Sequence, residues 1–387
     1  MAENQTVMPA LFAELLRRKP QMAQLLGQFV RCESPSHEKS AVDRMGDIVA
    51  REWKKRGAQV QTFRQKKRGN HVRAEIWFGA RRPPRQLLSI GHLDTVYPLG
   101  TLAKMPFQIR DGRAYGPGTF DMKAGLVLAL AAMDALRACG LKPEKRLVFL
   151  WNSDEEIGSE TSRGLIEKEA RGSDAVLVLE PAYGSRGKLK TARKGVGTAE
   201  IAVTGRAAHA GLNPGAGVNA VHELALQISR VMRMNDLARG IGVQATVVAG
   251  GTVSNVVPDH ARAHVDIRIA KLADGLRVER RIHQLRPILR GAQIQVSGGI
   301  NRPPLERTPA VVKLFEHAQK LMQKIGVCVE ESAVGGGSDG NFTAALGVPT
   351  LDGLGAIGDG AHSPREHALI RSLPERAALL AGLLATL

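Results

Sequence analysis

The chain has 387 residues, of which 43% are hydrophobic and 4% aromatic. This length is more than one hydrophobic core usually holds, so it suits two domains, and the apolar fraction excludes a disordered chain. The 54 Lys and Arg exceed the 37 Asp and Glu, and a net charge of +17 makes nucleic acid the first partner to consider. The basic residues are dispersed and not interleaved with aromatics, so we expect no nucleic-acid partner.

The cysteines and the hydropathy pattern indicate a cytoplasmic protein. Cys32, Cys139 and Cys328 are odd in number and widely spaced, which is typical of reduced thiols. The first residues lack the basic and then apolar pattern of a signal peptide. No stretch of about 18 apolar residues is present, so we expect no membrane partner.

The first half of the chain is predicted to alternate helices and strands. Residues 11–56 have apolar positions at helical spacing, with Gly57 as a stop, and residues 126–136 form an apolar helix that ends at Gly140. Short apolar runs predict buried strands at 87–90, 147–151 and 175–179. This alternation favours an α/β domain with a largely parallel sheet.

The pattern changes after residue 194. Half-buried strands are predicted at 195–203, 244–248 and 261–269, with a long helix at 218–234. This arrangement suits a compact α+β domain over residues 195–303, inserted into a larger domain formed by 1–194 and 304–387. The α/β pattern returns near Thr308, with a helix predicted at 311–325.

Two adjacent carboxylates at the end of a predicted strand are the most informative feature. Glu155 and Glu156 closely follow the apolar run 147–151, and charges beside a buried strand are costly unless they are paired or bind a cation. Neighbouring side chains at a strand end point in different directions. One glutamate is therefore able to hold a metal while the other moves a proton, as in metal-assisted hydrolysis.

Further candidates lie at other predicted strand ends and loops, and each has a plainer explanation. His92 and Asp94 face the same side of an extended segment, as a ligand and its orienting partner would, or as an ordinary pair. Asp121 precedes the apolar helix and is equally suited to capping it. Glu180 follows a strand, where solvated charges are common, and His362 lies in a Gly-rich loop, where exposed residues are common.

The combination of these residues is more specific than any one of them. Histidines and carboxylates without cysteine suit zinc or a similar divalent ion in a catalytic site. Five ligands with one shared carboxylate suit a centre with two metal ions.

The chain resembles the di-zinc aminoacylase and glutamate carboxypeptidase family, which includes acetylornithine deacetylase and succinyl-diaminopimelate desuccinylase. Bacterial glutamate carboxypeptidases are the most similar branch. Order and spacing agree along nearly the whole chain. The matching segments are Gly91–Pro98 (GHLDTVYP), Gly116–Gly125 (GPGTFDMKAG), Asp154–Ser159 (DEEIGS), Leu179–Pro181 (LEP), Ala208–Gly211 (AHAG), Gly335–Gly340 (GGGSDG) and His362.

The resemblance implies two Zn²⁺ ions per subunit, with Co²⁺ or Mn²⁺ as alternatives. Asp121 would bridge the two ions. Glu156 and His362 would complete one zinc site, and His92 and Glu180 the other. In the same way, Glu155 would be the general base and Asp94 would orient His92. A related branch that hydrolyses carbamoyl amides has histidine at the position of Glu180, so this residue argues against that branch.

The resemblance also implies a zinc-peptidase-like catalytic domain with a mixed, largely parallel sheet flanked by helices. The inserted domain would be a ferredoxin-like lid through which the chain forms a homodimer. His209 would reach the active site of the partner subunit and stabilise the oxyanion. The residues that match substrate-binding positions are Lys188, Asn255, Arg268, Arg302, Gly336 and Gly337.

The implied activity is hydrolysis of an amide or peptide bond that releases a C-terminal amino acid. The substrate would be a small peptide or N-acyl amino acid with a free carboxylate. Lys188 favours an acidic leaving amino acid. The alternatives are an N-acyl-amino-acid deacylase of the acetylornithine or desuccinylase type and a non-catalytic binding protein that keeps the fold. The complete set of ligands and base argues against the second alternative.

Overall fold

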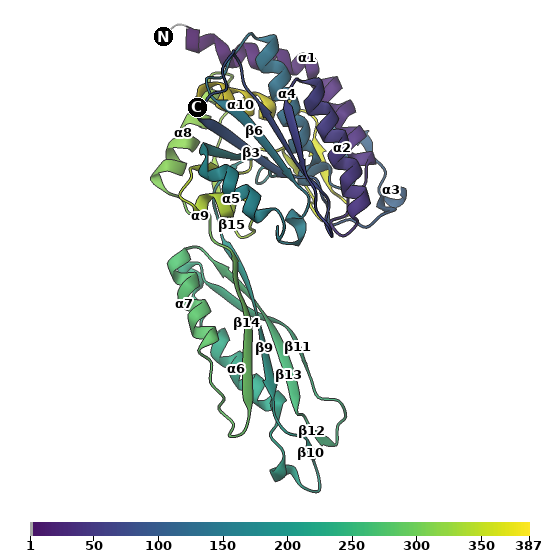
Figure 1. Ribbon diagram of the computed structural model, residues 1–387, viewed down its shortest axis with the longest axis vertical. Coiled ribbons are helices and arrows are strands. Elements are labelled where there is room, and N and C mark those ends of the chain that lie inside the picture. The colour runs from purple at the N-terminus through teal and green to yellow at the C-terminus, as the bar shows by residue number, and fades with distance from the viewer. Residues whose placement is uncertain (1–2) are drawn as a thin grey trace. The chain divides into compact units, whose positions relative to one another are not determined.

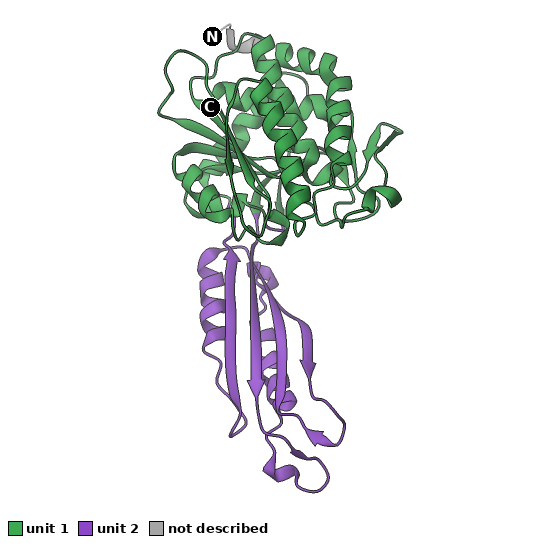
Figure 2. Cartoon of the chain, turned by 45° about the vertical axis from the view of Figure 1, so that its right-hand side comes forward, with its two compact units in different colours: residues 1–192, 307–333, 338–387 green, residues 193–306, 334–337 purple. Residues whose placement is uncertain are grey.

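The chain divides into two compact units. The computed structural model describes residues 3–387, and side chains from residue 7 onward. Unit 1 holds the chain up to Ala192 together with Arg307–Ala333 and Ser338–Leu387 (Figure 2). Unit 2 holds Arg193–Glu306 and the short segment Val334–Gly337. This segment joins unit 2 because the Lys194 N–H donates to the Val334 carbonyl at 2.9 Å.

A mixed six-stranded sheet forms the centre of unit 1, with the order β1-β2-β6-β3-β7-β16 (Figure 1). Its central strands run parallel to one another, whereas β1 and β2 pair antiparallel at one side. The predicted mixed, largely parallel sheet is therefore confirmed. The strands are β1 (Gln59–Phe63), β2 (His71–Ile76), β3 (Gln86–His92), β6 (Arg146–Asn152), β7 (Ser173–Val178) and β16 (Thr350–Leu351).

Helices cover both faces of this sheet because its strands are apolar on both sides. In β6, Leu147, Phe149 and Trp151 face one core, and Val148 and Leu150 face the other. The first core is covered by α1 (Glu3–Arg31), α2 (Lys39–Lys55), α4 (Ala124–Ala138), α8 (Pro309–Gln323) and α10 (Ser372–Thr386). The second is covered by α5 (Arg163–Arg171) and α9 (Gly340–Ala345).

The remaining elements of unit 1 are short. They are α3 (Thr101–Lys104), η1 (Thr119–Lys123) and η2 (Glu155–Ile157), with a small sheet of β4 (Gln108–Arg110), β5 (Arg113–Tyr115), β17 (Gly358–Asp359) and β18 (His367–Leu369). A further pair is formed by β8 (Leu189–Arg193) and β15 (Glu331–Val334). Within residues 3–387, no helix combines the length and the apolar character needed to cross a bilayer.

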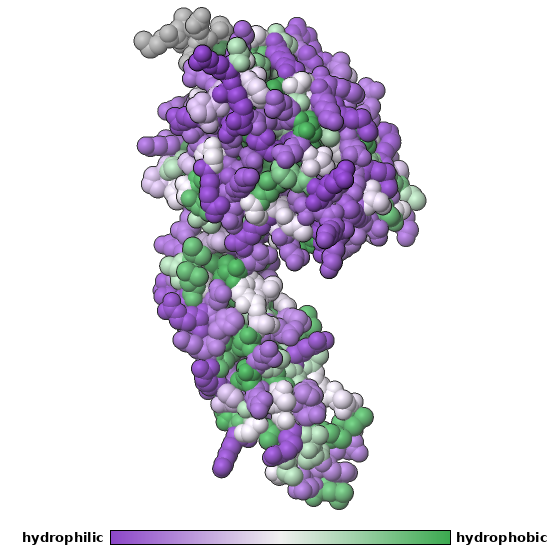
Figure 3. All heavy atoms as spheres, viewed as in Figure 1, coloured by the Kyte–Doolittle hydropathy of each residue, from purple (hydrophilic) through white to green (hydrophobic). Residues whose placement is uncertain are grey.

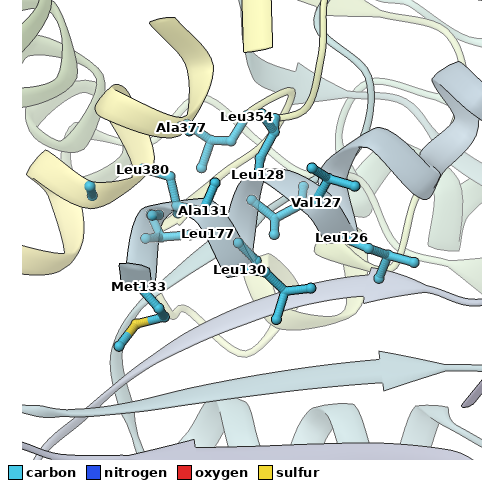
Figure 4. Close-up of a cluster of buried hydrophobic side chains, with 14 of the residues drawn as sticks. Leu126, Val127, Leu128, Leu130, Ala131, Met133, Leu177, Leu354, Ala377 and Leu380 are labelled. Carbon is cyan, nitrogen blue, oxygen red and sulfur yellow. The ribbon is translucent and has the colours of Figure 1, made fainter. Parts of the chain in front are cut away.

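Helix α4 is buried along most of its length. Its side chains gather with those of α10, and Figure 4 shows Leu128 and Ala131 near Ala377 and Leu380. A Cβ atom at Gly125, in the first turn of α4, would lie 2.4 Å from the Leu179 carbonyl oxygen. The absence of a side chain therefore allows the start of α4 to approach the chain that leads into Glu180.

Unit 2 is a four-stranded antiparallel sheet with two helices on one face. The chain order β9-α6-β11-β13-α7-β14 and the sheet order β11-β13-β9-β14 are those of a ferredoxin-like domain. The expected inserted α+β fold is therefore confirmed. The main elements are β9 (Gly195–Thr204), α6 (Ala220–Met232), β11 (Gly242–Gly250), β13 (His260–Ile269), α7 (Leu272–His283) and β14 (Gln293–Arg302). The short ones are β10 (Ala208–His209), η3 (Pro214–Ala216), η4 (Leu237–Arg239) and β12 (Val256–Val257).

The surfaces of the two units differ in hydropathy. In Figure 3 the visible surface of unit 1 is mostly hydrophilic with scattered hydrophobic residues, and hydrophobic residues take up a larger share of the visible surface of unit 2. Val247 and Val248 of β11 are each 57% exposed, and Leu212 is 84% exposed.

The close approach at Gly125 can be tested by adding one methyl group. Gly125→Ala is expected to lower the free energy of unfolding by about 1–3 kcal/mol, because the backbone around Leu179 has to move. Gly164→Ala is the matched control, because Gly164 lies in helix α5 and has no atom within 4 Å of its added Cβ. It is expected to raise the stability by about 0.5–1 kcal/mol. Denaturant unfolding measures both, and equal effects would contradict this packing.

Candidate metal centre

His92 lies at the carboxyl end of β3 and presents its two ring nitrogens to different partners. The side chain is 1% exposed. Its Nε2 lies 3.3 Å from Asp121 Oδ1 and 3.5 Å from Glu180 Oε1. Its Nδ1 lies 2.9 Å from the carbonyl oxygen of Asp94. A neutral ring that donates its Nδ1 proton to this carbonyl directs the lone pair of Nε2 towards the carboxylates, as metal ligation requires.

His362 forms a second group with Glu156 and the same aspartate. Its Nε2 lies 3.2 Å from Glu156 Oε2 and 3.4 Å from Asp121 Oδ2. The backbone of His362 has φ = 60°, a left-handed conformation that is uncommon for non-glycine residues. The Gly-rich loop therefore places this imidazole beside Glu156, which follows β6, and Asp121, which precedes α4.

The two groups share Asp121 and together hold five potential ligands. Within each group, one ligand atom per residue lies within 4.8 Å of the others. We call the five residues the ligand cluster: His92, Asp121, Glu156, Glu180 and His362. Helix capping does not explain the position of Asp121, because the residue at the N-cap of α4 is Lys123.

The pKa values of the ligand cluster show that its carboxylates attract positive charge. Hydrogen bonds with Asp121 and Glu156 raise the pKa of His362 to about 10. Burial alone would raise the pKa of Asp121, but contacts with the two histidines bring it well below its usual value. Burial raises the pKa of Glu156. The negative charge of these carboxylates is thus balanced by the two histidines of the cluster.

The residues present fit divalent cations. Glu156 Oε1 is buried and has no hydrogen-bond partner, as expected for an oxygen that is free to bind a metal. The donors are two imidazoles and three carboxylates, with no thiolate, and this set suits zinc, cobalt or manganese in a catalytic site. Because one carboxylate belongs to both groups, the arrangement is that of a two-metal centre.

Asp94 connects His92 to the two adjacent glutamates. Its carboxylate accepts a hydrogen bond from Ser36 Oγ at 2.7 Å and contacts the backbone N–H groups of Glu155 and Glu156, each at 3.3 Å. Its Oδ1 lies 3.5 Å from His92 Nδ1. Asp94 therefore faces His92, as the resemblance implies, and also holds the turn η2. Sequence reasoning missed this second contact and the serine.

The two adjacent glutamates lie in different surroundings. Both residues are half-buried, but Glu156 belongs to the ligand cluster whereas Glu155 lies outside both ligand groups. The preceding Asp154 is buried, and its carboxylate accepts the backbone N–H and hydroxyl of Thr161, both at 2.7 Å. The chain on both sides of the turn that bears the two glutamates is therefore anchored.

Glu366 is a further buried carboxylate beside this centre. It lies four residues after His362, and its Oε1 accepts the N–H groups of Phe120 and Asp121 at 2.8 and 2.9 Å. The motif around His362 contains it, but no sequence pattern shows that it contacts a segment more than 240 residues away.

The residues predicted to bind substrate are separated between the two units. In unit 1, Lys188 Nζ lies 2.6 Å from Glu330 Oε2. In unit 2, the Arg268 guanidinium binds Asp266 with two contacts of 2.9 and 3.0 Å. Arg302 is 6% exposed at the end of β14.

The other predicted substrate residues contribute backbone groups to unit 2. Asn255 is exposed, and its carbonyl accepts the Ala210 N–H at 2.8 Å. The carbonyls of Gly336 and Gly337 accept hydrogen bonds from Arg193 Nη1 at 3.1 and 3.0 Å. The ligand cluster of unit 1 includes none of these residues.

His209 lies at the end of the β10–β12 ribbon in unit 2, with a defined orientation. Its Nδ1 accepts the backbone N–H groups of Gly211 and Leu212, each at 3.1 Å. An Nδ1 that accepts hydrogen bonds carries no proton, so the neutral ring has its proton on Nε2. His209 therefore presents an N–H donor from an exposed loop.

Comparison with known proteins agrees with this geometry. The model of peptidase family M20/M25/M40 matches residues 88–386. The chain is 32% identical over 381 residues to carboxypeptidase G2 from Pseudomonas sp. (strain RS-16), covering 97% of this chain and 91% of that protein. It is 28% identical over 311 residues to succinyl-diaminopimelate desuccinylase from Paracidovorax citrulli (strain AAC00-1), covering 76% and 78%.

The fold is also similar to that of solved structures. Aminopeptidase PepT from Bacillus cereus ATCC 10987 superposes with a TM-score of 0.76 at 20% identity, covering 95% of this chain and 98% of that chain. The match to the family model spans most of the chain, and two overlapping ligand groups lie within the matched residues. The chain therefore belongs to peptidase family M20/M25/M40, a family of metal-dependent hydrolases in which a dinuclear metal centre is typical.

Proposed function

We propose that this protein is a metallo-carboxypeptidase that releases a C-terminal amino acid, preferentially an acidic one, from a small peptide or N-acyl amino acid. The observation that carries this proposal is the position of Glu155 next to the ligand cluster, held by Asp94 through the turn that also bears Glu156. The similarity to carboxypeptidase G2 along 97% of the chain supports a carboxypeptidase rather than another hydrolase.

We propose zinc as the metal, with cobalt or manganese as alternatives. His92 and Glu180 would hold one ion, Glu156 and His362 the other, and Asp121 would contact both. When bound, such ions lower the pKa of a water molecule and polarise a carbonyl group. The chain supplies the remaining groups.

Glu155 would act as the general acid and base. Its carboxylate takes the proton of the attacking water and then transfers it to the leaving nitrogen, so the bond to that nitrogen breaks as an amine forms. This role requires a carboxylate that does not serve as a metal ligand, and Glu155 lies outside both ligand groups whereas Glu156 belongs to one of them. The two backbone contacts of Asp94 hold the turn that bears both glutamates.

His209 would stabilise the oxyanion through its Nε2–H group. Its Nδ1 contacts fix the tautomer in which Nε2 is the donor, which is the form that such a role needs. Arg268, Asn255 and backbone N–H groups of the segment at Gly336 and Gly337 would orient the free carboxylate of the substrate. Lys188 and Arg302 would bind the acidic side chain, with Lys188 exchanging Glu330 for the substrate carboxylate.

A deacylase is the second candidate function. The similarity to succinyl-diaminopimelate desuccinylase favours it, although that match has lower identity and covers 76% of this chain. Both candidates use the same ligand cluster and base, so they differ in the groups that flank the scissile bond.

We also propose a homodimer formed through strand β11. This strand lies at one edge of the unit 2 sheet, and its sequence GVQATVVAG has no charged residue and no proline. Exposed edges of this kind favour pairing with another strand, and Val247 and Val248 would be covered by it. A two-fold axis between two β11 strands would join the sheets of two subunits.

A substrate panel tests the proposed activity. The metal-loaded protein is assayed with N-acyl and peptidyl derivatives of glutamate, ornithine, diaminopimelate and alanine that share one acyl group. We expect glutamate release to have the highest kcat/KM, because Lys188 and Arg302 favour a second carboxylate. Lys188→Ala should then lower kcat/KM for glutamate derivatives and leave alanine derivatives unchanged. Preferred release of ornithine or diaminopimelate would instead establish the deacylase.

Mixing two inactive variants tests the dimer and His209 together. Glu155→Gln lacks the base, and His209→Ala lacks the proposed donor. If His209 serves the partner subunit, half of the subunit pairs in an equal mixture are heterodimers, and each restores one intact site. We therefore expect about a quarter of the wild-type activity after exchange of subunits. The same mixture with Val248→Asp added to both chains should stay inactive. No recovery in the first mixture would contradict a histidine shared between subunits.

A further inference from the structure

We propose that Glu366 is a positioning residue that fixes Asp121 and His362 in the geometry that binds two cations, an inference that rests on the proposed function. The carboxylate is fully buried. Its Oε1 accepts the N–H groups of Phe120 and Asp121, and its Oε2 lies 3.3 Å from the Gly118 nitrogen and 2.5 Å from the Tyr97 hydroxyl. Four donors thus converge on one side chain.

Three of these donors belong to the turn that carries the shared ligand. The N–H groups of Gly118, Phe120 and Asp121 point to one side of η1, where they form a concave binding place for an anion. The Asp121 carboxylate points to the other side, towards His92 and His362. A displacement of Glu366 would therefore move the backbone of Asp121 and, with it, a ligand of both cations.

The same residue closes the loop that carries His362. The Glu366 N–H donates to the Ser363 carbonyl at 3.1 Å, and Ser363 Oγ donates to the Gly360 carbonyl at 2.8 Å. The Tyr97 hydroxyl lies 3.0 Å from that Ser363 carbonyl as well as beside the Glu366 carboxylate. Tyr97 follows Asp94 by three residues, so segments that carry His92, Asp121 and His362 all meet at Glu366.

The contacts of Glu366 are directed at backbone groups rather than at a cationic side chain. Within residues 7–387, it forms no ion pair with Lys, Arg or His, and it is absent from the ligand cluster itself. Side chains that support metal ligands in this way typically alter metal affinity 10- to 100-fold when they are changed. The expected defect is therefore in cation binding rather than in the fold.

Glu366→Gln is the informative variant. A glutamine still accepts hydrogen bonds from Phe120 and Asp121 through its carbonyl, but its NH₂ group opposes the Gly118 N–H. We expect Co²⁺ to bind at least about 10-fold more weakly at one or both positions, with a changed Co²⁺ absorption spectrum, while the circular dichroism spectrum stays native. Titration of the metal-free chain with Co²⁺ measures these quantities without reference to turnover.

Glu223→Gln is the matched control. Glu223 is also fully buried and also accepts backbone N–H groups, those of Ile288 and Leu289 at 3.1 and 2.7 Å, but it lies in unit 2 and contacts no member of the ligand cluster. The same chemical change there should leave the dissociation constants for Co²⁺ unchanged. Equal effects of the two variants would overturn the positioning role, because they would show a general response to a buried amide.

Tyr97→Phe provides a second test that does not depend on the folding of Glu366→Gln. It removes one donor and leaves the three amide contacts, so we expect a smaller loss of Co²⁺ affinity in the same direction. Wild-type affinity in Tyr97→Phe and in Glu366→Gln would overturn the inference. A wild-type chain that binds no Co²⁺ would contradict the proposed function itself, and with it the role of Glu366. Weakened binding in Glu366→Gln beside normal binding in Glu223→Gln supports both.

Discussion

The structure depends on the burial of three carboxylates against two histidines at one edge of the unit 1 sheet. Asp121, Glu156 and Glu180 lie close enough that their mutual repulsion has to be balanced by positive charge. In the chain alone this charge comes from protons, which is why the pKa of His362 rises to about 10. Two divalent cations would replace these protons and also satisfy the buried Glu156 Oε1.

The rest of unit 1 brings these side chains together from distant parts of the sequence. Parallel strands place His92 and the glutamate turn at the same edge, because β3 and β6 pair in register with His92 opposite Asn152. Gly125 lets α4 approach the end of β7, so that Asp121 and Glu180 converge. The Asp94 carboxylate accepts backbone N–H groups of the turn that bears Glu156, and the Glu366 carboxylate accepts those of the turn that bears Asp121. Most of these contacts constrain the backbone of a ligand, and Asp94 also contacts the His92 ring.

Much of this arrangement could be predicted from the sequence. The apolar runs before His92, Asp154 and Glu180 are strong strand signals, and the carboxyl ends of parallel strands gather at one edge of a sheet. The residue types and their spacing pointed to a metal centre with one shared carboxylate. The order of strands and helices also indicated an inserted α+β domain, although the strands β1, β2 and β14 and the helices α5, α7 and α10 were not predicted.

The missed features depend on contacts that no local pattern contains. Ser36 contacts Asp94 across 58 positions, and Glu366 contacts Asp121 across 245. Neither has a periodicity that would distinguish it from an ordinary loop residue. The segment Val334–Gly337 joins unit 2 for a similar reason, because its partner is the distant Lys194. Sequence patterns thus indicated Asp94 and the five residues that the structure brings together in the ligand cluster, and missed Ser36 and Glu366, which contact them.

The central claim is that the adjacent glutamates have separate roles, with Glu156 binding metal and Glu155 moving protons. The most direct test is to measure the metal content and the turnover of Glu155→Gln and Glu156→Gln side by side, with exposed Glu160→Gln as the control. We predict that Glu155→Gln keeps two cations per chain and loses turnover by about 10²–10⁴-fold, whereas Glu156→Gln loses a cation. Near-normal turnover in Glu155→Gln, or loss of its metal, would contradict this account.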